Sequence, residues 1–247
     1  MSARHHRLRR IFRMISALAL CLVLPAAPAA AADSIPPGDW RGILSTRGGT
    51  GPVYAVLRAR AAGADGMQGA ELRFGPPFNC ALELRAQADD YALQSRSGKF
   101  CDALSGGRAQ LQARDGMASG IQLTLLGREA PLVIALDQKA DAALTEAGRW
   151  RSNGLTSAQL DLVATAVRPG DVVGRLRYGA PRDCQVELRY AGHEAGALTA
   201  WIGANDRGYC RGLSDSQARM QMRPDGSAVL SLLLHGQRDM VSFERVP

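Results

Sequence analysis

The sequence is poor in histidine, the side chain that most often carries protons or binds metals near neutral pH. It holds four histidines among 247 residues, and only His193 and His235 lie beyond residue 32. This scarcity limits imidazole-based catalysis and metal binding. His193 is flanked by Gly192 and Gly196, which predicts a solvated turn residue with no catalytic role.

An apolar run long enough to cross a membrane as a helix is also missing. The stretch from Met14 to Leu24 holds 11 residues, whereas a spanning helix needs about 20. Arginines precede it, and Pro25 and small residues up to Ala32 follow it. This order predicts a cleavable signal peptide over residues 1–32 and no transmembrane anchor after cleavage. We therefore expect a periplasmic or secreted protein.

Two other export routes compete with ordinary secretion. A lipoprotein would be modified at Cys21, but bulky Leu20 stands where such signals need a small residue. The pair Arg9-Arg10 leaves twin-arginine export open, although Leu8 replaces the usual polar residue before the pair.

A large excess of charge of one sign is missing from the chain beyond residue 32. That part carries 25 basic and 23 acidic side chains, a net charge of +2, with the signs interspersed in both halves. Neither half offers the concentrated positive field that nucleic acid or an anionic membrane requires. We therefore expect no nucleic-acid partner.

The chain does contain an internal repeat, in which three segments recur in the same order. Gly38–Arg41 matches Gly148–Arg151, and Phe100–Ser105 matches Tyr209–Ser214. The longest match pairs residues 72–85 with residues 176–189. After the signal peptide over 1–32, the repeat predicts a first domain over 33–137, a connector over 138–147 and a second domain over 148–247.

Four cysteines remain beyond the predicted signal peptide, one pair in each repeat unit. A unit that can be duplicated must close its own bridge, so we expect the disulfides Cys80–Cys101 and Cys184–Cys210. Such bridges agree with an oxidising compartment. A four-cysteine metal site is disfavoured because it would span two domains and lacks paired Cys-x-x-Cys spacing, so no metal or cofactor is expected.

Alternating apolar and polar residues predict strands throughout both units. In the first unit the expected strands cover residues 40–45, 53–60, 69–74, 80–85, 91–95, 109–113, 120–126 and 132–136. The stretch 155–167 would also suit a helix. The fold class is therefore all-β, a tandem duplication of a small antiparallel β-barrel or sandwich with one disulfide in each unit.

A Gly-x-Trp motif opens the first strand of each unit, at Gly38–Trp40 and Gly148–Trp150. The motif resembles the start of lipocalin and avidin-like (calycin) barrels. This resemblance implies an up-and-down barrel whose tryptophan closes one end, with a ligand at the other. In size, compartment and strand content each unit is also similar to the small disulfide-bonded barrels that inhibit lysozymes in bacterial periplasms.

Candidate catalytic patterns have ordinary structural interpretations. Glu83 and Glu187 recur in the repeat, but each precedes an arginine by two residues on the same strand face, which predicts surface ion pairs. Gly48–Gly51 lacks the Lys-Ser/Thr and the helix of a phosphate loop.

The loop before each predicted bridge is the best candidate for recognition, because a disulfide-pinned loop with proline presents a fixed surface. Its candidate binding residues are Gly75, Pro76, Pro77, Phe78 and Asn79 in the first unit, and Gly179, Pro181, Arg182 and Asp183 in the second.

The leading hypothesis for function is a non-catalytic exported binding protein that presents these loops or a barrel mouth to a cell-envelope partner. That partner is either a protein, as for an inhibitor or immunity factor, or a small ligand or glycan. The alternatives are an envelope hydrolase with carboxylates assembled between the domains, and a structural envelope component that forms large oligomers.

Overall fold

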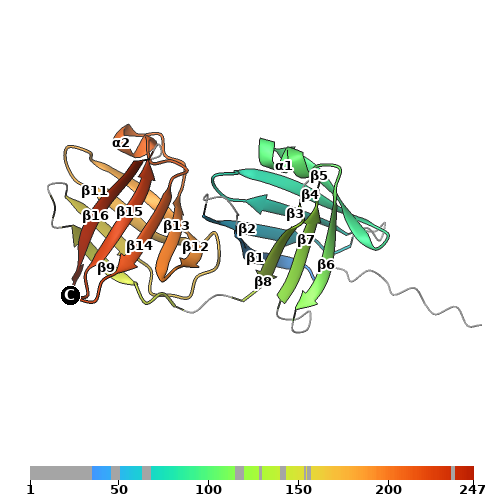
Figure 1. Cartoon of the computed structure of the whole chain (residues 1–247), viewed down its shortest axis with the longest axis horizontal. Helices are drawn as coiled ribbons and strands as arrows, with labels where there is room; N and C mark the ends of the chain where they lie inside the picture. Colours follow the sequence, from blue (N-terminus) through green and yellow to red (C-terminus); the bar gives the residue numbers. More distant parts are fainter. Residues whose placement is uncertain are drawn as a thin grey trace, which may run out of the picture. The chain divides into compact units, whose positions relative to one another are not determined.

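The computed structural model describes residues 35–45, 51–62, 68–114, 120–127, 130–139, 143–152, 154, 157–234 and 237–247. Figure 1 shows that these residues form two separate sets of strands, with a short helix in each. The predicted signal peptide, the glycines at 48 and 49 and His235 lie outside the described residues.

The first set of strands closes into an eight-stranded antiparallel barrel in which each strand pairs with its sequence neighbours. The barrel closes because β1 also pairs with β8. The short helix α1 (Lys99–Leu104) joins β5 to β6. The strands are β1 (Gly38–Ser45), β2 (Pro52–Ala59), β3 (Gly69–Phe74), β4 (Cys80–Gln87), β5 (Asp90–Ser97), β6 (Arg108–Arg114), β7 (Gly120–Leu126) and β8 (Leu132–Asp137).

The second set of strands repeats this topology, and β16 closes its barrel by pairing with β9. The helix α2 (Gly208–Arg211) lies in the connection that matches the one holding α1. The strands are β9 (Gly148–Ser152), β10 (Ala158–Leu162), β11 (Val172–Tyr178), β12 (Cys184–Glu194), β13 (Ala197–Ile202), β14 (Gln217–Met222), β15 (Ala228–Leu234) and β16 (Gln237–Val246).

The predicted fold class is confirmed, and the architecture is a barrel in both units. The eight strands expected in the first unit differ from the observed strands by two residues or fewer at either end. Within 155–167 the chain forms the strand β10 and no helix among its described residues. The two short helices were not predicted.

Both predicted disulfides are confirmed. Cys80 pairs with Cys101, and Cys184 pairs with Cys210. Each joins the first residue of a strand to a short helix. Figure 1 shows α1 beside β4 and β5. Paired cysteines are typical of exported proteins, because disulfides persist in oxidising compartments. Neither helix in the described part of the chain is long and apolar enough to cross a membrane.

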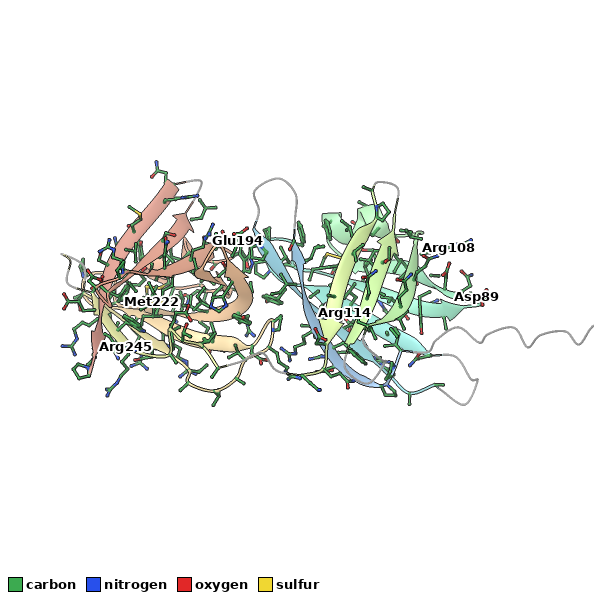
Figure 2. The ribbon with its side chains drawn as sticks, turned by 60° about the horizontal axis from the view of Figure 1, so that its bottom comes forward. Asp89, Arg108, Arg114, Glu194, Met222 and Arg245 are labelled. Carbon is green, nitrogen blue, oxygen red and sulfur yellow. A yellow bond between two sulfur atoms is a disulfide. The ribbon has the colours of Figure 1, made fainter. Side chains whose placement is uncertain are left out.

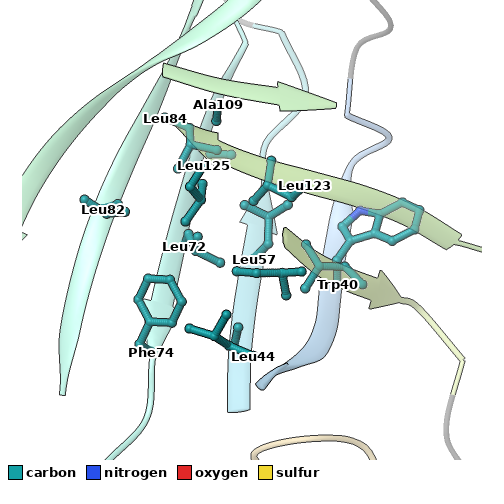
Figure 3. Packing of buried hydrophobic residues seen from close by; sticks show 14 of the residues in the cluster. Trp40, Leu44, Leu57, Leu72, Phe74, Leu82, Leu84, Ala109, Leu123 and Leu125 are labelled. Atoms are coloured by element: carbon teal, nitrogen blue, oxygen red, sulfur yellow. The ribbon is translucent and has the colours of Figure 1, made fainter. Parts of the chain in front are cut away.

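Side chains fill the barrel interiors. Alternate residues of each strand point inward, and in the first barrel Leu57, Leu72 and Leu123 are fully buried. Figure 3 shows these side chains gathered between the strands, and Figure 2 shows charged side chains such as Arg108 on the outside. In the second barrel a gap of about 10 Å³ remains among the core side chains. That gap holds a water molecule at most, so the interior ligand implied by the calycin resemblance has no room there.

The Gly-x-Trp motif has the same structural role in both barrels. Trp40 and Trp150 are fully buried, and each indole N–H donates to the carbonyl oxygen four residues earlier, Pro36 at 2.8 Å and Glu146 at 2.9 Å. Gly38 and Gly148 have φ angles of +132° and +131°. Such angles are open essentially to glycine alone, which explains why the motif begins with this residue.

The two ends of each barrel differ because consecutive strands run in opposite directions. The connections β1–β2, β3–β4, β5–β6 and β7–β8 share one end, and the start of β1 with Trp40 lies at the other. We call the end with the β3–β4 or β11–β12 connection the loop rim. Both predicted recognition loops lie at the loop rim of their own barrel, opposite the tryptophan.

Candidate functional site

The two candidate loops have the same backbone geometry. The Gly75 carbonyl accepts hydrogen bonds from the N–H groups of Phe78 and Asn79, both at 3.1 Å. The Gly179 carbonyl accepts from Arg182 and Asp183, also at 3.1 Å. The peptide bonds before Pro77 and Pro181 are both cis. The duplicated loop is therefore one frame that carries two different sets of side chains.

The residue that precedes the first cysteine of each disulfide has a left-handed backbone conformation, which favours Asn or Asp among non-glycine residues. Asn79 and Asp183 have φ angles of 44° and 35°. The disulfide that follows ties the loop to its short helix. The structure thus brings the predicted loop residues together in one pinned turn in each barrel.

The loop rim of the first barrel carries an aromatic cluster. The rings of Phe78 and Phe100 stack with centres 3.8 Å apart and planes 4° from parallel. Phe74 meets both rings edge-on, at 6.4 Å from Phe78 and 5.3 Å from Phe100. Phe74 is buried, Phe78 and Phe100 are partly exposed, and Pro77 is exposed. The cluster therefore joins the barrel core to the surface of the loop.

The loop rim of the second barrel carries a polar cluster at the same place. The guanidinium carbon of Arg182 lies 4.0 Å from the centre of the Tyr209 ring and 5.3 Å from that of Tyr178. The Tyr209 hydroxyl donates to Asp239 at 3.2 Å, and Arg182 lies 3.8 Å from the same carboxylate. Burial raises the pKa of Tyr178 and of Tyr209, so both phenols stay neutral at physiological pH.

The two clusters correspond residue by residue. The repeat aligns Phe74 with Tyr178, Phe78 with Arg182 and Phe100 with Tyr209. Strand register supplies the fourth pair, because Leu125 pairs with Leu132 across β7 and β8 as Leu232 pairs with Asp239 across β15 and β16. Leu132 is partly buried and packs against the first core. All four positions are apolar in the first barrel, and all four carry a polar group in the second.

A groove adjoins the aromatic cluster on the outer face of the first barrel. It consists of two hollows of about 250 and 420 Å³ that share Glu71 and Arg96. The larger one reaches Phe74 and Asn79 at the candidate loop. We call it the β3–β5 groove, and its polar lining is Arg60, Glu71, Arg73, Asn79, Glu83, Arg96 and Ser97.

The two carboxylates of this groove are paired with arginines. Glu71 accepts from Arg73 at 2.9 Å, and Glu83 lies 3.2 Å from Arg85 and 2.6 Å from Arg96. The hydrogen bonds from Arg85, together with the charges of Arg85 and Arg96, lower the pKa of Glu83. Glu83 is therefore ionised at neutral pH and is unsuited to act as the general acid of a hydrolase. The predicted pairs of Glu83 with Arg85 and of Glu187 with Arg189 are both present.

His193 lies in a strand and not in the predicted turn, although its side chain is exposed as expected. Strand β12 continues to Glu194, and His193 pairs with Leu198 across β13 after a bulge. Its Nε2 atom lies 3.2 Å from Oε1 of the buried Glu146. Gly192, with a φ angle of 100°, makes the bulge possible and explains why the sequence looked like a loop. Among the described residues no group of three His, Cys, Asp or Glu side chains is placed to hold a metal ion.

Sequence reasoning missed part of the site. It identified the loops but not Phe100 and Tyr209, which lie one residue before the second cysteine of each bridge. The signal was present, because an aromatic residue precedes that cysteine in both copies. Leu132, Asp239 and the β3–β5 groove had no such signal, since strand register alone brings them to the rim.

Comparisons of this chain with protein families, with curated proteins and with solved structures find no match.

Proposed function

We propose that this protein is exported and binds a cell-envelope partner without catalysis, through the loop rim of its first barrel. The proposal rests on one observation, the replacement of four apolar rim positions in the first barrel by four polar ones in the second. Because the loop frame is the same in both barrels, the difference lies in the side chains, of which Phe78 and Phe100 in the first barrel are partly exposed.

The first rim exposes apolar surface that the fold does not need. Phe78 and Phe100 are partly exposed there, where the second barrel has Arg182 and Tyr209. Exposed Val133 and Pro77 do not distinguish the two rims, because Met240 and Pro181 are exposed at the equivalent positions of the second barrel. The second barrel has the same topology and a polar rim, so an apolar rim is not a requirement of this fold. Exposed apolar patches of this kind mark interaction sites in soluble proteins. A partner that covers the patch would remove this apolar surface from water.

Three of the four polar side chains of the second rim, Arg182, Tyr209 and Asp239, contact one another, whereas the buried hydroxyl of Tyr178 has no hydrogen-bond partner among the described residues. Arg182 covers the Tyr209 ring, and Asp239 accepts from Tyr209 and pairs with Arg182. A partner would have to disrupt these contacts before it gained its own. We therefore assign binding to the first barrel, and treat the second loop, with Gly179, Pro181, Arg182 and Asp183, as a scaffold copy.

Export is supported by the predicted signal peptide over residues 1–32 and by the two disulfides. Both features suit a protein that acts in the periplasm or outside the cell.

The test is retention of a partner from an envelope extract of the source organism. Residues 33–247 are produced in an oxidising periplasm and immobilised, and the retained molecules are identified by mass spectrometry. Phe78→Arg copies the second barrel's rim, and Gln110→Arg adds the same charge at an exposed position of β6. We expect wild type and Gln110→Arg to retain one defined molecule and Phe78→Arg to lose it. Equal retention by all three, or turnover of an envelope polymer without retention, would overturn the proposal.

A further inference from the structure

The β3–β5 groove carries charges of both signs in alternation. Arg60, Arg73 and Arg96 supply three positive charges, and Glu71 and Glu83 supply two negative ones. A strongly acidic partner would meet the two carboxylates, and a strongly basic one would meet the three guanidinium groups. Because like charges across an interface are costly, the groove favours an occupant with little charge of its own.

The same lining offers hydrogen-bond donors and acceptors side by side. Arg73 lies 2.9 Å from Glu71, and Arg96 lies 2.6 Å from Glu83, so each donor group adjoins an acceptor group. A hydroxyl both donates and accepts, and neighbouring hydroxyls can use both members of such a pair. A chain rich in hydroxyl groups therefore matches the lining better than an apolar chain does.

Two further features narrow the class of partner. The strands β3 and β4 of the groove pair with a neighbouring strand on both sides, so the groove offers no free strand edge to which an extended peptide could add. The groove reaches Phe74 in the rim cluster, whose outer members Phe78 and Phe100 are partly exposed. The faces of aromatic rings are electron-rich, and they attract the C–H groups of sugar rings while excluding water from them.

We infer that the partner is a sugar chain with little net charge, which lies in the β3–β5 groove and contacts the ring pair Phe78 and Phe100 at its rim end. The larger hollow, at about 420 Å³, falls within the roughly 300–1,000 Å³ of small-ligand sites, so it holds a short segment of such a chain. This inference rests on the proposed function and names its partner.

The first experiment treats the envelope extract before it meets the immobilised protein. One portion is digested exhaustively with proteinase K, and another is heated in strong acid to cleave glycosidic bonds and then neutralised. The inference predicts that binding survives the protease and disappears after the acid. Loss of binding after the protease alone would overturn the sugar inference while leaving the proposed function intact. No binding to the untreated extract would overturn both.

The second experiment locates the chain in the groove. Glu83→Gln removes the charge that holds Arg85 and Arg96, and Glu187→Gln is its matched control because the repeat places Glu187 at the same position in the second barrel. We expect Glu83→Gln to weaken binding of the protease-treated fraction at least about tenfold and Glu187→Gln to change it less than about twofold. Equal effects would overturn the placement.

Ionic strength tests the charge argument separately. Binding of an uncharged chain should change less than about threefold between 50 and 500 mM NaCl, because no ion pairs form between the partners. A fall of a hundredfold or more would identify a charged partner and contradict the inference.

Discussion

The guanidinium group of Arg182 lies over the Tyr209 ring at 4.0 Å, at the position where the Phe78 ring of the first barrel stacks on Phe100 at 3.8 Å. The loops that carry the two residues have the same pattern of backbone hydrogen bonds, and each has a residue with a left-handed backbone conformation followed by a disulfide. Duplication has thus kept the frame and changed the surface, which is expected when one copy binds and the other does not.

The two loop glycines should differ in their tolerance of alanine. A Cβ atom on Gly75 would lie 2.2 Å from Cζ of the Tyr54 ring, whereas one on Gly179 would lie 3.1 Å from the small side chain of Ser157. Gly75→Ala should therefore cost about 1–3 kcal/mol of unfolding free energy in urea, and Gly179→Ala less than about 1 kcal/mol. Equal losses in the two variants would show that the Tyr54 contact does not set the loop.

Replacing Trp40 by phenylalanine should destabilise the first barrel. The change keeps an aromatic ring but removes the indole N–H, which leaves the Pro36 carbonyl without its 2.8 Å donor. We expect a loss of about 1–3 kcal/mol in urea unfolding. Trp150→Phe should behave alike, because it removes the 2.9 Å bond to the Glu146 carbonyl. Unchanged stability in both variants would mean that these bonds do not anchor the barrels.

Removing the Cys80–Cys101 bridge by a double serine substitution should lower stability by about 3 kcal/mol, because the bridge closes a loop of 21 residues in the unfolded chain. The Cys184–Cys210 bridge spans 26 residues and should contribute almost the same amount. Calorimetry of the two double variants measures the loss of unfolding free energy that follows the removal of each bridge. A loss confined to one barrel would contradict their equivalence.

The carboxyl group of Glu83 should titrate below its ordinary pKa of 4.5, chiefly because of its hydrogen bonds to Arg85 and also because of the charge of Arg96. Since folding lowers this pKa, the stabilisation is present above pH 4.5 and is lost as the pH falls through the folded value. The group is partly exposed, so the contribution stays below about 1 kcal/mol. Carbon-13 NMR should show the pKa rising in Arg85→Ala and rising less in Arg96→Ala. A pKa unchanged in Arg85→Ala would contradict this assignment.

The strands could be predicted because each has one wet and one buried face, so the sequence alternates with a period of two. The bridges followed from the repeat, since each pair recurs within its own unit. The helices could not be foreseen, because six residues in α1 and four in α2 are too few to show a helical period.

The candidate site could be predicted only where it is local in sequence. The loop residues from Gly75 to Asn79 are contiguous, and proline and glycine mark their turn. The equivalence of Leu132 and Asp239 depends on strand register in the β7–β8 and β15–β16 pairs. The two residues are chemically different, so the sequence alone does not reveal that they occupy the same position. His193 was misplaced because a glycine at a β-bulge looks like a glycine in a loop.

The central claim is that the first barrel binds and the second does not. The most direct measurement is the affinity of residues 33–247 for the retained envelope molecule, compared between Phe78→Arg and Arg182→Phe, with circular dichroism to verify that both variants fold. The account predicts a loss of at least about tenfold for Phe78→Arg and a change below about threefold for Arg182→Phe. Folded variants with equal affinities, or a loss confined to Arg182→Phe, would contradict it.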